Sequence, residues 1–159
     1  MNFRTTDLLD AHPELEACEA GLGHYGGVRR FSGEVVTVRC CEDNSRVREL
    51  LQSPGGGRVL VVDGGASRRC ALIGDMLAAA AQRNGWVGVI VAGCVRDVAA
   101  LGALAIGVMA LGVQPRRSDK HGQAVAGVPL EILGARVRPG DVAYADEDGV
   151  VFSQQRLAD

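Results

Sequence analysis

The stretch GDMLAAAAQRNGWVGVIVAGCVRD, from Gly74 to Asp97, decides the fold. Its first part predicts a helix over about Asp75–Arg83, because consecutive alanines favour helix and the following Asn84-Gly85 pair is a suitable helix end. Its second part, Val87–Ala92, is a continuous apolar run typical of a buried strand. The stretch therefore predicts a helix that leads directly into a buried strand.

The same alternation continues on both sides of this stretch. Val59–Val62 predicts a buried strand that ends at Asp63-Gly64-Gly65, and Ile106–Leu111 predicts a third strand after a short Ala/Leu helix. Strands that alternate with helices pair in parallel within one sheet. We therefore expect an α/β fold built on parallel strands.

The flanking segments predict smaller elements. Upstream, Val35–Cys40 predicts a strand, and Asn44 or Ser45 is expected to start a helix that runs to about Gln52. Downstream of Gly112 the chain becomes a polar loop and then predicts a small antiparallel β region. The loop, strands and turns are expected at Arg116–Gln123, Val128–Leu133, Pro139–Asp141, Val142–Tyr144, Asp146–Gly149 and Val150–Phe152. No interdomain linker interrupts this order, so residues 1–159 are predicted to form a single domain.

The composition excludes several classes of protein. The 159 residues are 47% hydrophobic with a formal net charge of -2, which gives no overall attraction to nucleic acid. No apolar run approaches the length of a membrane span, and charged residues interrupt Asn2–Asp10 where a signal peptide would need an apolar core. We expect a cytoplasmic protein that binds neither membranes nor nucleic acid directly.

The five cysteines do not predict a metal or disulfide framework. They form an odd set without a CxxC pair and without a histidine at zinc-finger spacing. Buried, reduced thiols are the expected state. Cys94 lies next to the motif described below, but it has no evident histidine partner that would make it a nucleophile.

Two short polar segments follow predicted strands and are the candidate site. Gly74-Asp75-Met76-Leu77 opens the predicted helix, and Arg96-Asp97 follows after 20 residues that intervene between Asp75 and Arg96. In parallel sheets, ligands bind at the carboxyl ends of the strands, so the two segments are expected to converge on one crevice.

The residue types in these segments suit an anionic ligand and a hard metal ion. A helix start offers free N–H groups for a carboxylate, and Gly74 permits close approach. Arg96 can hold a carboxylate or an enolate oxygen, while Asp97 offers the oxygen donor that Mg²⁺ or Mn²⁺ prefers. From spacing alone a plainer interpretation stays open, in which Asp75 and Asp97 cap helices and Arg96 is solvated.

A family resemblance adds to this interpretation. Gly74–Leu77, Gly93–Asp97, Pro139–Asp141 and Ala145–Val151 resemble segments of the class II 4-hydroxy-4-methyl-2-oxoglutarate aldolases, a family that also contains the regulator of ribonuclease activity A. The resemblance runs from about Thr5 to Phe152. It implies a β/β/α swivelling-type sandwich, assembled as a homotrimer or a pair of trimers, with active sites at subunit interfaces.

The resemblance also implies roles for individual residues. Backbone amides from Gly74 through Met76 to Leu77 would bind the carboxylate of a pyruvyl group, and Arg96 would hold the substrate and stabilise its enolate. Asp97 would bind the divalent metal cofactor, Mg²⁺ or Mn²⁺, and Asp75 would position a metal-bound or catalytic water. Family members that act only as ribonuclease regulators tend to lack this pattern, whereas it is intact here. An acidic residue that some members contribute from a neighbouring subunit has no secure match in this chain.

These roles predict a metal-dependent aldolase that splits 4-hydroxy-4-methyl-2-oxoglutarate into two pyruvates, and that also decarboxylates oxaloacetate through the same enolate. Schiff-base chemistry is disfavoured, because the single lysine, Lys120, lies in a polar loop. Two other functions stay open: a non-enzymatic inhibitor that binds an RNA-degrading endonuclease, and a binding module that keeps a pyruvate-like ligand site without turnover.

Two further motifs have weaker claims. Asp146-x-Asp148-Gly149 has part of a calcium-loop pattern, but a hairpin turn is the better prediction. Val61–Gly65 has part of the glycine pattern of cofactor-binding methyltransferases, in a chain that is short for that fold.

Overall fold

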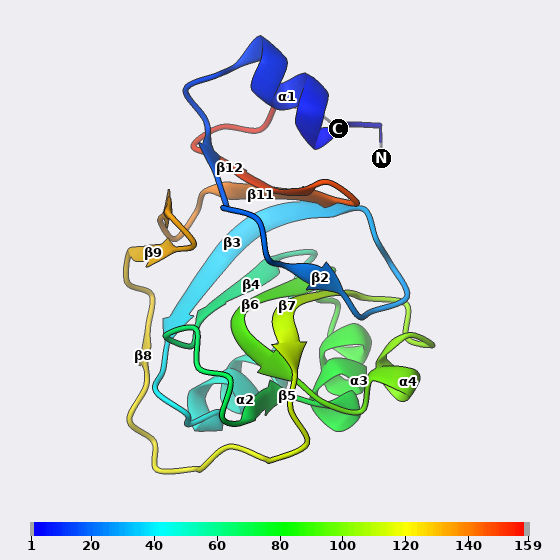
Figure 1. Ribbon diagram of the computed structural model, residues 1–159, viewed down its shortest axis with the longest axis vertical. Helices are drawn as coiled ribbons and strands as arrows, with labels where there is room; N and C mark the ends of the chain where they lie inside the picture. The colour runs from blue at the N-terminus through cyan, green and yellow to red at the C-terminus, as the bar shows by residue number, and fades with distance from the viewer. Residues whose placement is uncertain (1, 158–159) are drawn as a thin grey trace.

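The protein is built on one long sheet that curls over itself (Figure 1). The computed structural model describes residues 2–157, so the predicted domain of residues 1–159 extends past the described residues at both ends. The principal sheet path is β1-β12-β11-β3-β4-β6-β7-β2. The elements are α1 (Thr5–Ala11), β1 (Glu16–Ala17), β2 (Gly23–His24), β3 (Phe31–Arg39), α2 (Ser45–Leu51), β4 (Val59–Asp63), β5 (Ala71–Ile73), α3 (Asp75–Arg83), β6 (Gly88–Val95), α4 (Val98–Leu101), β7 (Gly107–Val113), β8 (Val125–Ala126), β9 (Leu130–Ile132), β10 (Ala135–Val137), β11 (Val142–Asp146) and β12 (Gly149–Ser153).

The centre of the sheet is parallel, as the alternating sequence predicts. β4 pairs in parallel with β3 on one side and with β6 on the other, and β7 pairs in parallel with β6. Every residue of β6 is buried, which explains why the sequence shows a continuous apolar run there in place of an alternating one. The predicted helix from Asp75 to Arg83 is confirmed, with Asn84 as its C-cap residue.

β3 joins two layers of the sandwich. Its first residues pair antiparallel with β11, whereas residues 35–39 pair in parallel with β4. The predicted antiparallel region is confirmed in the β11–β12 hairpin, but through β3 this hairpin continues the same sheet. The curled sheet therefore supplies both β layers.

Two hydrophobic cores define a β/β/α sandwich, and the expected fold is confirmed. The inner core lies within the curled sheet and includes Phe31, Ile90 and Phe152. The outer core packs the other face of the parallel strands against α2 and α3, through residues such as Leu51 and Ala81. Figure 1 shows these helices gathered on one side of the parallel strands. Among residues 2–157, no helix is long and apolar enough to cross a membrane.

Six elements are absent from the sequence prediction, namely α1 and the short strands β1, β2, β5, β8 and β10. β5 has only three residues and lies between β4 and α3, where it pairs with β6 and so becomes the strand that leads into Gly74. α1 is held by a tertiary contact, because Asp146 accepts hydrogen bonds from the amide and hydroxyl of Thr5 at 2.7 Å each. Burial alone would raise the pKa of Asp146, but the hydrogen bonds from Thr5, Asp148 and Gly149 outweigh it and lower the pKa.

Candidate active site

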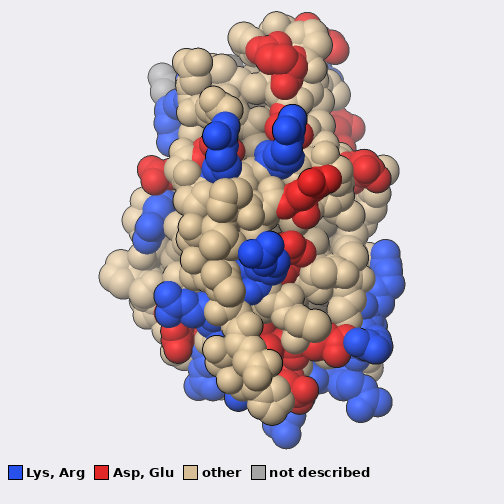
Figure 2. Space-filling model, turned by 90° about the vertical axis from the view of Figure 1, so that its left-hand side faces the viewer, with Lys and Arg blue, Asp and Glu red and all other residues tan. Residues whose placement is uncertain are grey.

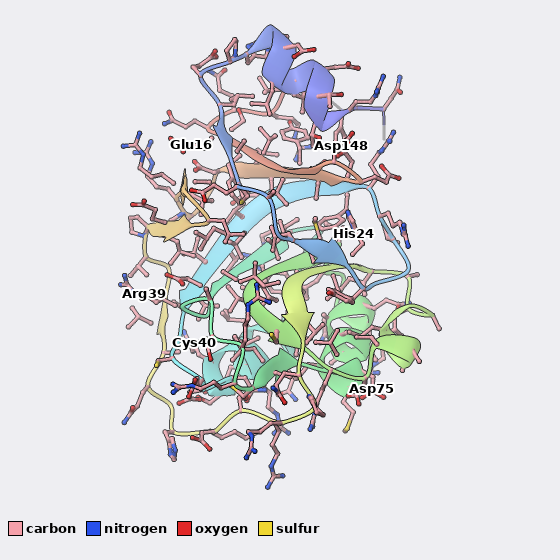
Figure 3. All side chains as sticks on the ribbon, in the orientation of Figure 1. Glu16, His24, Arg39, Cys40, Asp75 and Asp148 are labelled. Atoms are coloured by element: carbon pink, nitrogen blue, oxygen red, sulfur yellow. The ribbon has the colours of Figure 1, made fainter. Side chains whose placement is uncertain are left out.

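The two polar segments lie side by side because the strands that precede them are neighbours. Ile73 of β5 is the register partner of Val95 of β6, so each strand delivers its next residues to the same edge. The amide of Arg96 donates to the carbonyl of Ile73 at 3.0 Å, which ties the two loops together. Figure 3 places Asp75 beside α3 at the lower end of the molecule. The predicted convergence on one crevice is confirmed, with β5 in the position that the sequence assigned to an earlier strand.

The carboxylate of Asp97 lies against the first turn of α3. Its Oδ2 accepts a hydrogen bond from the amide of Asp75 at 3.3 Å and lies 3.8 Å from Nε of Arg96. A Cβ atom on Gly74 would stand 2.5 Å from the same Oδ2, so any other residue would push the Asp97 carboxylate away from the helix start. Gly74 therefore permits the close approach of Asp97, and the helix start receives a negative charge as its free N–H groups favour.

Asp97 has a backbone conformation that few residues other than glycine adopt. Its φ of 58° and ψ of 41° lie in the left-handed region, where aspartate is one of the better tolerated residues. It occupies the N-cap position of α4, yet its side chain makes no capping hydrogen bond to that helix. The side chain of Asp97 therefore does not cap α4, the helix that follows it, and its one helix contact is the bond from the amide of Asp75 at the start of α3. Backbone strain of this kind is concentrated at functional sites.

Asp75 and Arg96 also differ from the plainer interpretation, in which Asp75 caps a helix and Arg96 is solvated. Gly74, and not Asp75, is the N-cap residue of α3, and Asp75 lies in the first helical turn with its side chain at the cleft. Arg96 is only 40% exposed, and its Nη1 donates to the carbonyl of Pro115 at 3.4 Å. The guanidinium is therefore oriented by the protein and also lines the cleft.

The cleft beside these segments has a volume of about 270 Å³ and a basic wall. The acidic residues Asp75 and Asp97 line it together with five cationic side chains. These are Arg48, Arg83, Arg96, Arg117 and Lys120. Figure 2 shows Lys and Arg side chains gathered at the lower end of the molecule, where the loop after β7 and α2 lie in Figure 1. The charge balance suits a small ligand with more than one negative group.

Part of the basic wall of the cleft was not predicted from the sequence. Arg117 and Lys120 belong to the polar loop that follows β7, and Arg48 belongs to α2. Lys120 was expected in a solvated loop, whereas the structure brings it to the cleft. The basic pair Arg116-Arg117 was the available signal, but nothing in the local sequence shows that the loop returns to the start of β5. The amide of Ala71 donates to the carbonyl of Arg116 at 2.7 Å, and this contact makes the return.

Asn44 contributes an orphan polar atom beside the cleft. Its Nδ2 donates to the carbonyl of Leu72 at 3.0 Å, while its Oδ1 is buried without a hydrogen-bond partner. An unsatisfied buried acceptor costs about 1–3 kcal/mol. The wall of the cleft therefore holds a free acceptor next to its cationic groups.

The donors that could hold a metal are oxygens and are few. Among residues 2–157 no group of three or more His, Cys, Asp or Glu side chains is placed to bind a metal ion. Asp97 is 42% exposed at the cleft, and its carboxylate contacts are long, so it is able to accept a cation. One carboxylate, completed by substrate and water oxygens, suits Mg²⁺.

The thiols and the weaker motifs do not add a second site. Cys94 is 2% exposed, which does not suit a nucleophile. Cys40 and Cys70 are also buried, but Cys41 is exposed and Cys18 is half-buried, so the expectation of buried thiols is wrong for these two. Burial raises the pKa of Cys18 to about 12.

The glycine and aspartate turns are explained by packing. A Cβ atom on Gly64 would lie 2.8 Å from the carbonyl oxygen of Ala92, and Asp63 accepts the amide of Gly65 at 2.9 Å. This segment is therefore a tight turn packed on β6. The hairpin prediction for Asp146–Gly149 is confirmed, since Asp146 pairs with Gly149 across β11 and β12.

Comparisons with known proteins agree on one family. The model of the RraA-like family, described as Aldolase/RraA, matches residues 5–152. A protein of Laribacter hongkongensis, named provisionally as a 4-hydroxy-4-methyl-2-oxoglutarate aldolase, is 52% identical, and the alignment covers 99% of each chain.

Two solved structures have nearly the same fold. The RNA-processing inhibitor RraA of Thermus thermophilis is 46% identical with a TM-score of 0.95, over 99% of this chain and 96% of that chain. A structure from Geobacillus kaustophilus, titled S-adenosylmethionine: 2-dimethylmenaquinone methyltransferase, is 49% identical with a TM-score of 0.93, over 98% and 97%. The three names describe three different activities, so the site must decide among them.

Proposed function

The chain belongs to the RraA-like (Aldolase/RraA) family, and on that premise we propose that it is a metal-dependent lyase that cleaves 4-hydroxy-4-methyl-2-oxoglutarate into two molecules of pyruvate. The observation that carries this proposal is the meeting of Asp75, Arg96 and Asp97 at one basic cleft. An inhibitor that acts only by binding another protein needs no such arrangement.

The substrate suits the charges of the cleft. It carries two carboxylates, and cationic side chains line the cleft. The amides of Met76 and Leu77 lie in the first turn of α3, where helix N–H groups lack partners within the helix. We assign them the carboxylate next to the 2-oxo group, and we assign Arg96 the 2-oxo oxygen.

The reaction follows from these assignments. A base removes the proton of the 4-hydroxyl group, the C3–C4 bond breaks, and its electron pair becomes the enolate of one pyruvate while C4 becomes the carbonyl of the other. Arg96 stabilises the negative charge that develops on the enolate oxygen. We assign Asp75, which lines the cleft, the role of holding the water that accepts the hydroxyl proton, and protonation of the enolate at C3 completes the second pyruvate.

We assign Asp97 the role of metal ligand. A bound Mg²⁺ or Mn²⁺ would supply Lewis-acid stabilisation of the charge that develops on the 2-oxo acid. The partly exposed carboxylate and the absence of a capping bond to α4 support this role. Oxaloacetate loses CO₂ to give the same enolate, so we propose decarboxylation as a second activity of the site.

The test is pyruvate release from both substrates, with Mg²⁺ or Mn²⁺ and then with EDTA, corrected for decarboxylation by metal alone. We expect metal-dependent turnover that falls at least about a hundredfold in Arg96→Ala, in line with the loss of one preorganised oxyanion donor. Arg29→Ala is the matched control, because Arg29 is exposed and does not line the cleft. No turnover above the metal blank on either substrate would refute the lyase.

A second candidate is the inhibition of an RNA-degrading endonuclease. It is favoured by the likeness to the Thermus protein, which is named as an RNA-processing inhibitor. This function would be unaffected by Arg96→Ala. Inhibition of endonuclease cleavage by both the wild type and this variant, without pyruvate release by either, would establish it. Oxalate binding without turnover would instead indicate a binding module.

The methyltransferase name of the Geobacillus structure does not carry over on this geometry. The turn after β4 owes its glycine to close packing on Ala92, as described above, and a cofactor is not needed to explain it. The cleft itself is small and basic, which suits a short dianion better than a nucleoside.

We also propose that the chain assembles as a homotrimer, with pairing of trimers as a further step. Met76 is 82% exposed at the rim of the cleft, and Val98 and Val113 are exposed at the starts and ends of neighbouring elements. Exposed apolar side chains around a site are expected where another subunit covers them.

A further inference from the structure

The loop of residues 116–123 is held by a buried acidic clasp. Oδ2 of Asp43 accepts hydrogen bonds from the amides of His121 at 2.9 Å and Gln123 at 3.1 Å. The amide between them, that of Gly122, donates to Oγ of Ser45 at 3.0 Å. Three consecutive N–H groups of the loop are therefore held by two side chains at the start of α2.

The other carboxylate oxygen of Asp43 is also held by hydrogen bonds. Oδ1 of Asp43 accepts the amide of Ser45 at 2.9 Å and its hydroxyl at 2.7 Å. The backbone adds two bonds: the amide of Asp119 donates to the carbonyl of Glu42 at 2.9 Å, and the amide of Asn44 donates to the carbonyl of Asp119 at 3.2 Å. Both carboxylate oxygens of Asp43 are thus fully engaged.

Burying the carboxylate of Asp43 at this position costs free energy. It is 3% exposed, although the loop residues that it holds are exposed or half-exposed. The loop sequence RRSDKHGQ has no large apolar side chain that could anchor it in a core. Hydrogen bonds to an ionised group are stronger than those between neutral groups, so the clasp supplies the anchoring that packing does not.

The loop carries two of the cationic groups of the active-site cleft. Arg117 and Lys120 line the cleft, while Asp43 does not. Without the Asp43 carboxylate the loop would keep its backbone bonds to Glu42 and Asn44 and the bond from Gly122 to Ser45, but the amides of His121 and Gln123 would lose their acceptor, and the end of the loop would open locally. The positions of these two charges therefore depend on a carboxylate that lies outside the cleft.

We propose that Asp43 is a positioning residue, which with Ser45 holds the loop so that Lys120 and Arg117 bind the distal carboxylate of a 2-oxo dicarboxylate. This inference rests on the proposed function and deepens it. The carboxylate next to the 2-oxo group is assigned to α3, so the second carboxylate needs a separate cationic partner. The loop residues provide that partner and make the enzyme selective for dicarboxylates.

Asp43→Asn weakens the clasp with little change in volume. An amide has one acceptor oxygen, and its NH₂ group must face either Ser45 or the loop amides. If the oxygen stays on Ser45, the amides of His121 and Gln123 face a donor. If it turns to the loop, the amide of Ser45 faces a donor. Either arrangement breaks half of the clasp.

The experiment compares two substrates that differ only at the distal group. One is 4-hydroxy-4-methyl-2-oxoglutarate, and the other is 4-hydroxy-4-methyl-2-oxopentanoate, which has a methyl group in place of the distal carboxylate and gives pyruvate and acetone. In Asp43→Asn we expect KM for the dicarboxylate to rise about tenfold with kcat within about twofold, and kcat/KM for the monocarboxylate to stay within about twofold. Ser45→Ala should show a smaller change in the same direction.

Two controls separate positioning from general damage. Asp141→Asn makes the same change in an aspartate that accepts the amide of Arg138 at 2.9 Å, in a turn away from the cleft, and should alter neither substrate. Lys120→Met should raise KM for the dicarboxylate, and adding Asp43→Asn to it should cause much less further loss than in the wild type, because the two residues act through one contact.

Other outcomes overturn the inference. An equal loss on both substrates in Asp43→Asn and Ser45→Ala would make the clasp merely structural, and no change in KM would remove its role. If the wild type turned over the dicarboxylate no better than the monocarboxylate, the loop would have no distal site. Wild-type inactivity on both substrates would refute the proposed lyase itself, and the positioning role with it.

Discussion

Asp97 combines a strained backbone with an exposed carboxylate, and these two properties can be separated by substitution. A φ of 58° raises the conformational free energy of aspartate, whereas it raises that of glycine little. A residue that stability alone selected would be glycine here. The backbone conformation therefore does not by itself explain the carboxylate, which agrees with the proposed role of Asp97 as a metal ligand.

We predict that Asp97→Ala and Asp97→Gly both abolish metal-dependent turnover and both fold. Asp97→Gly should be more stable than Asp97→Ala by about 1 kcal/mol in urea unfolding, because alanine is strained in the left-handed region. Weakened binding of Mn²⁺, followed by its electron paramagnetic resonance, is the second readout. Failure of both variants to fold would make Asp97 a structural residue.

At the level of elements, the sequence predicts those that are long and regular. The continuous apolar runs of β4 and β6 and the alanines of α3 identify each element, because local propensity and burial agree there. β5 could not be predicted, since three residues carry no period and owe their conformation to β6. Asp75 and Asp97 were found from the polar segments, but the loop with Lys120 was not, because a clasp between distant residues leaves no local pattern.

The clasp should also give a signature in the pH dependence of stability. Burial raises the pKa of Asp43, but the hydrogen bonds from Ser45, Gln123 and His121 outweigh it and hold the pKa well below its usual range. A folded-state pKa below that of the unfolded chain stabilises the fold at pH values above the unfolded pKa, about 3.9 for aspartate. This stabilisation is lost as the pH falls below 3.9 toward the folded pKa.

We therefore predict that wild type exceeds Asp43→Asn in free energy of unfolding by a constant amount between about pH 5 and pH 7, and that the difference narrows as the pH falls below about 4. Urea unfolding at several pH values measures it. A difference that widened in acid would have the wrong sign for a carboxylate whose pKa is lowered by folding.

At the level of the whole molecule, the β/β/α sandwich was implied by resemblance and not by the pattern of elements. The predicted strands fix a parallel sheet, but they do not show that β3 bends to serve two layers. The pairing of Phe31 with Ala145 joins residues far apart in the chain, and no local signal encodes it. The subunit arrangement is equally absent from a single chain.

We predict that light scattering gives a mass three times that of the 16.6 kDa chain, or six times if trimers pair. Val113→Glu should shift the mass toward monomer, because it places a charge on an exposed apolar position at the end of β7. A wild-type monomer with full activity would refute an interfacial active site.

β3, which belongs to both layers of the sandwich, also limits the order in which parts of the chain can fold during synthesis. β3 leaves the ribosome early, but the partner of its first half, β11, is made more than 100 residues later. The parallel strands and the loops of the candidate site can associate while the aromatic ring of Phe31 is not yet covered by the rest of the inner core. The nascent chain therefore passes through an interval in which its inner core is incomplete, and this interval lasts until β11 and β12 have been made.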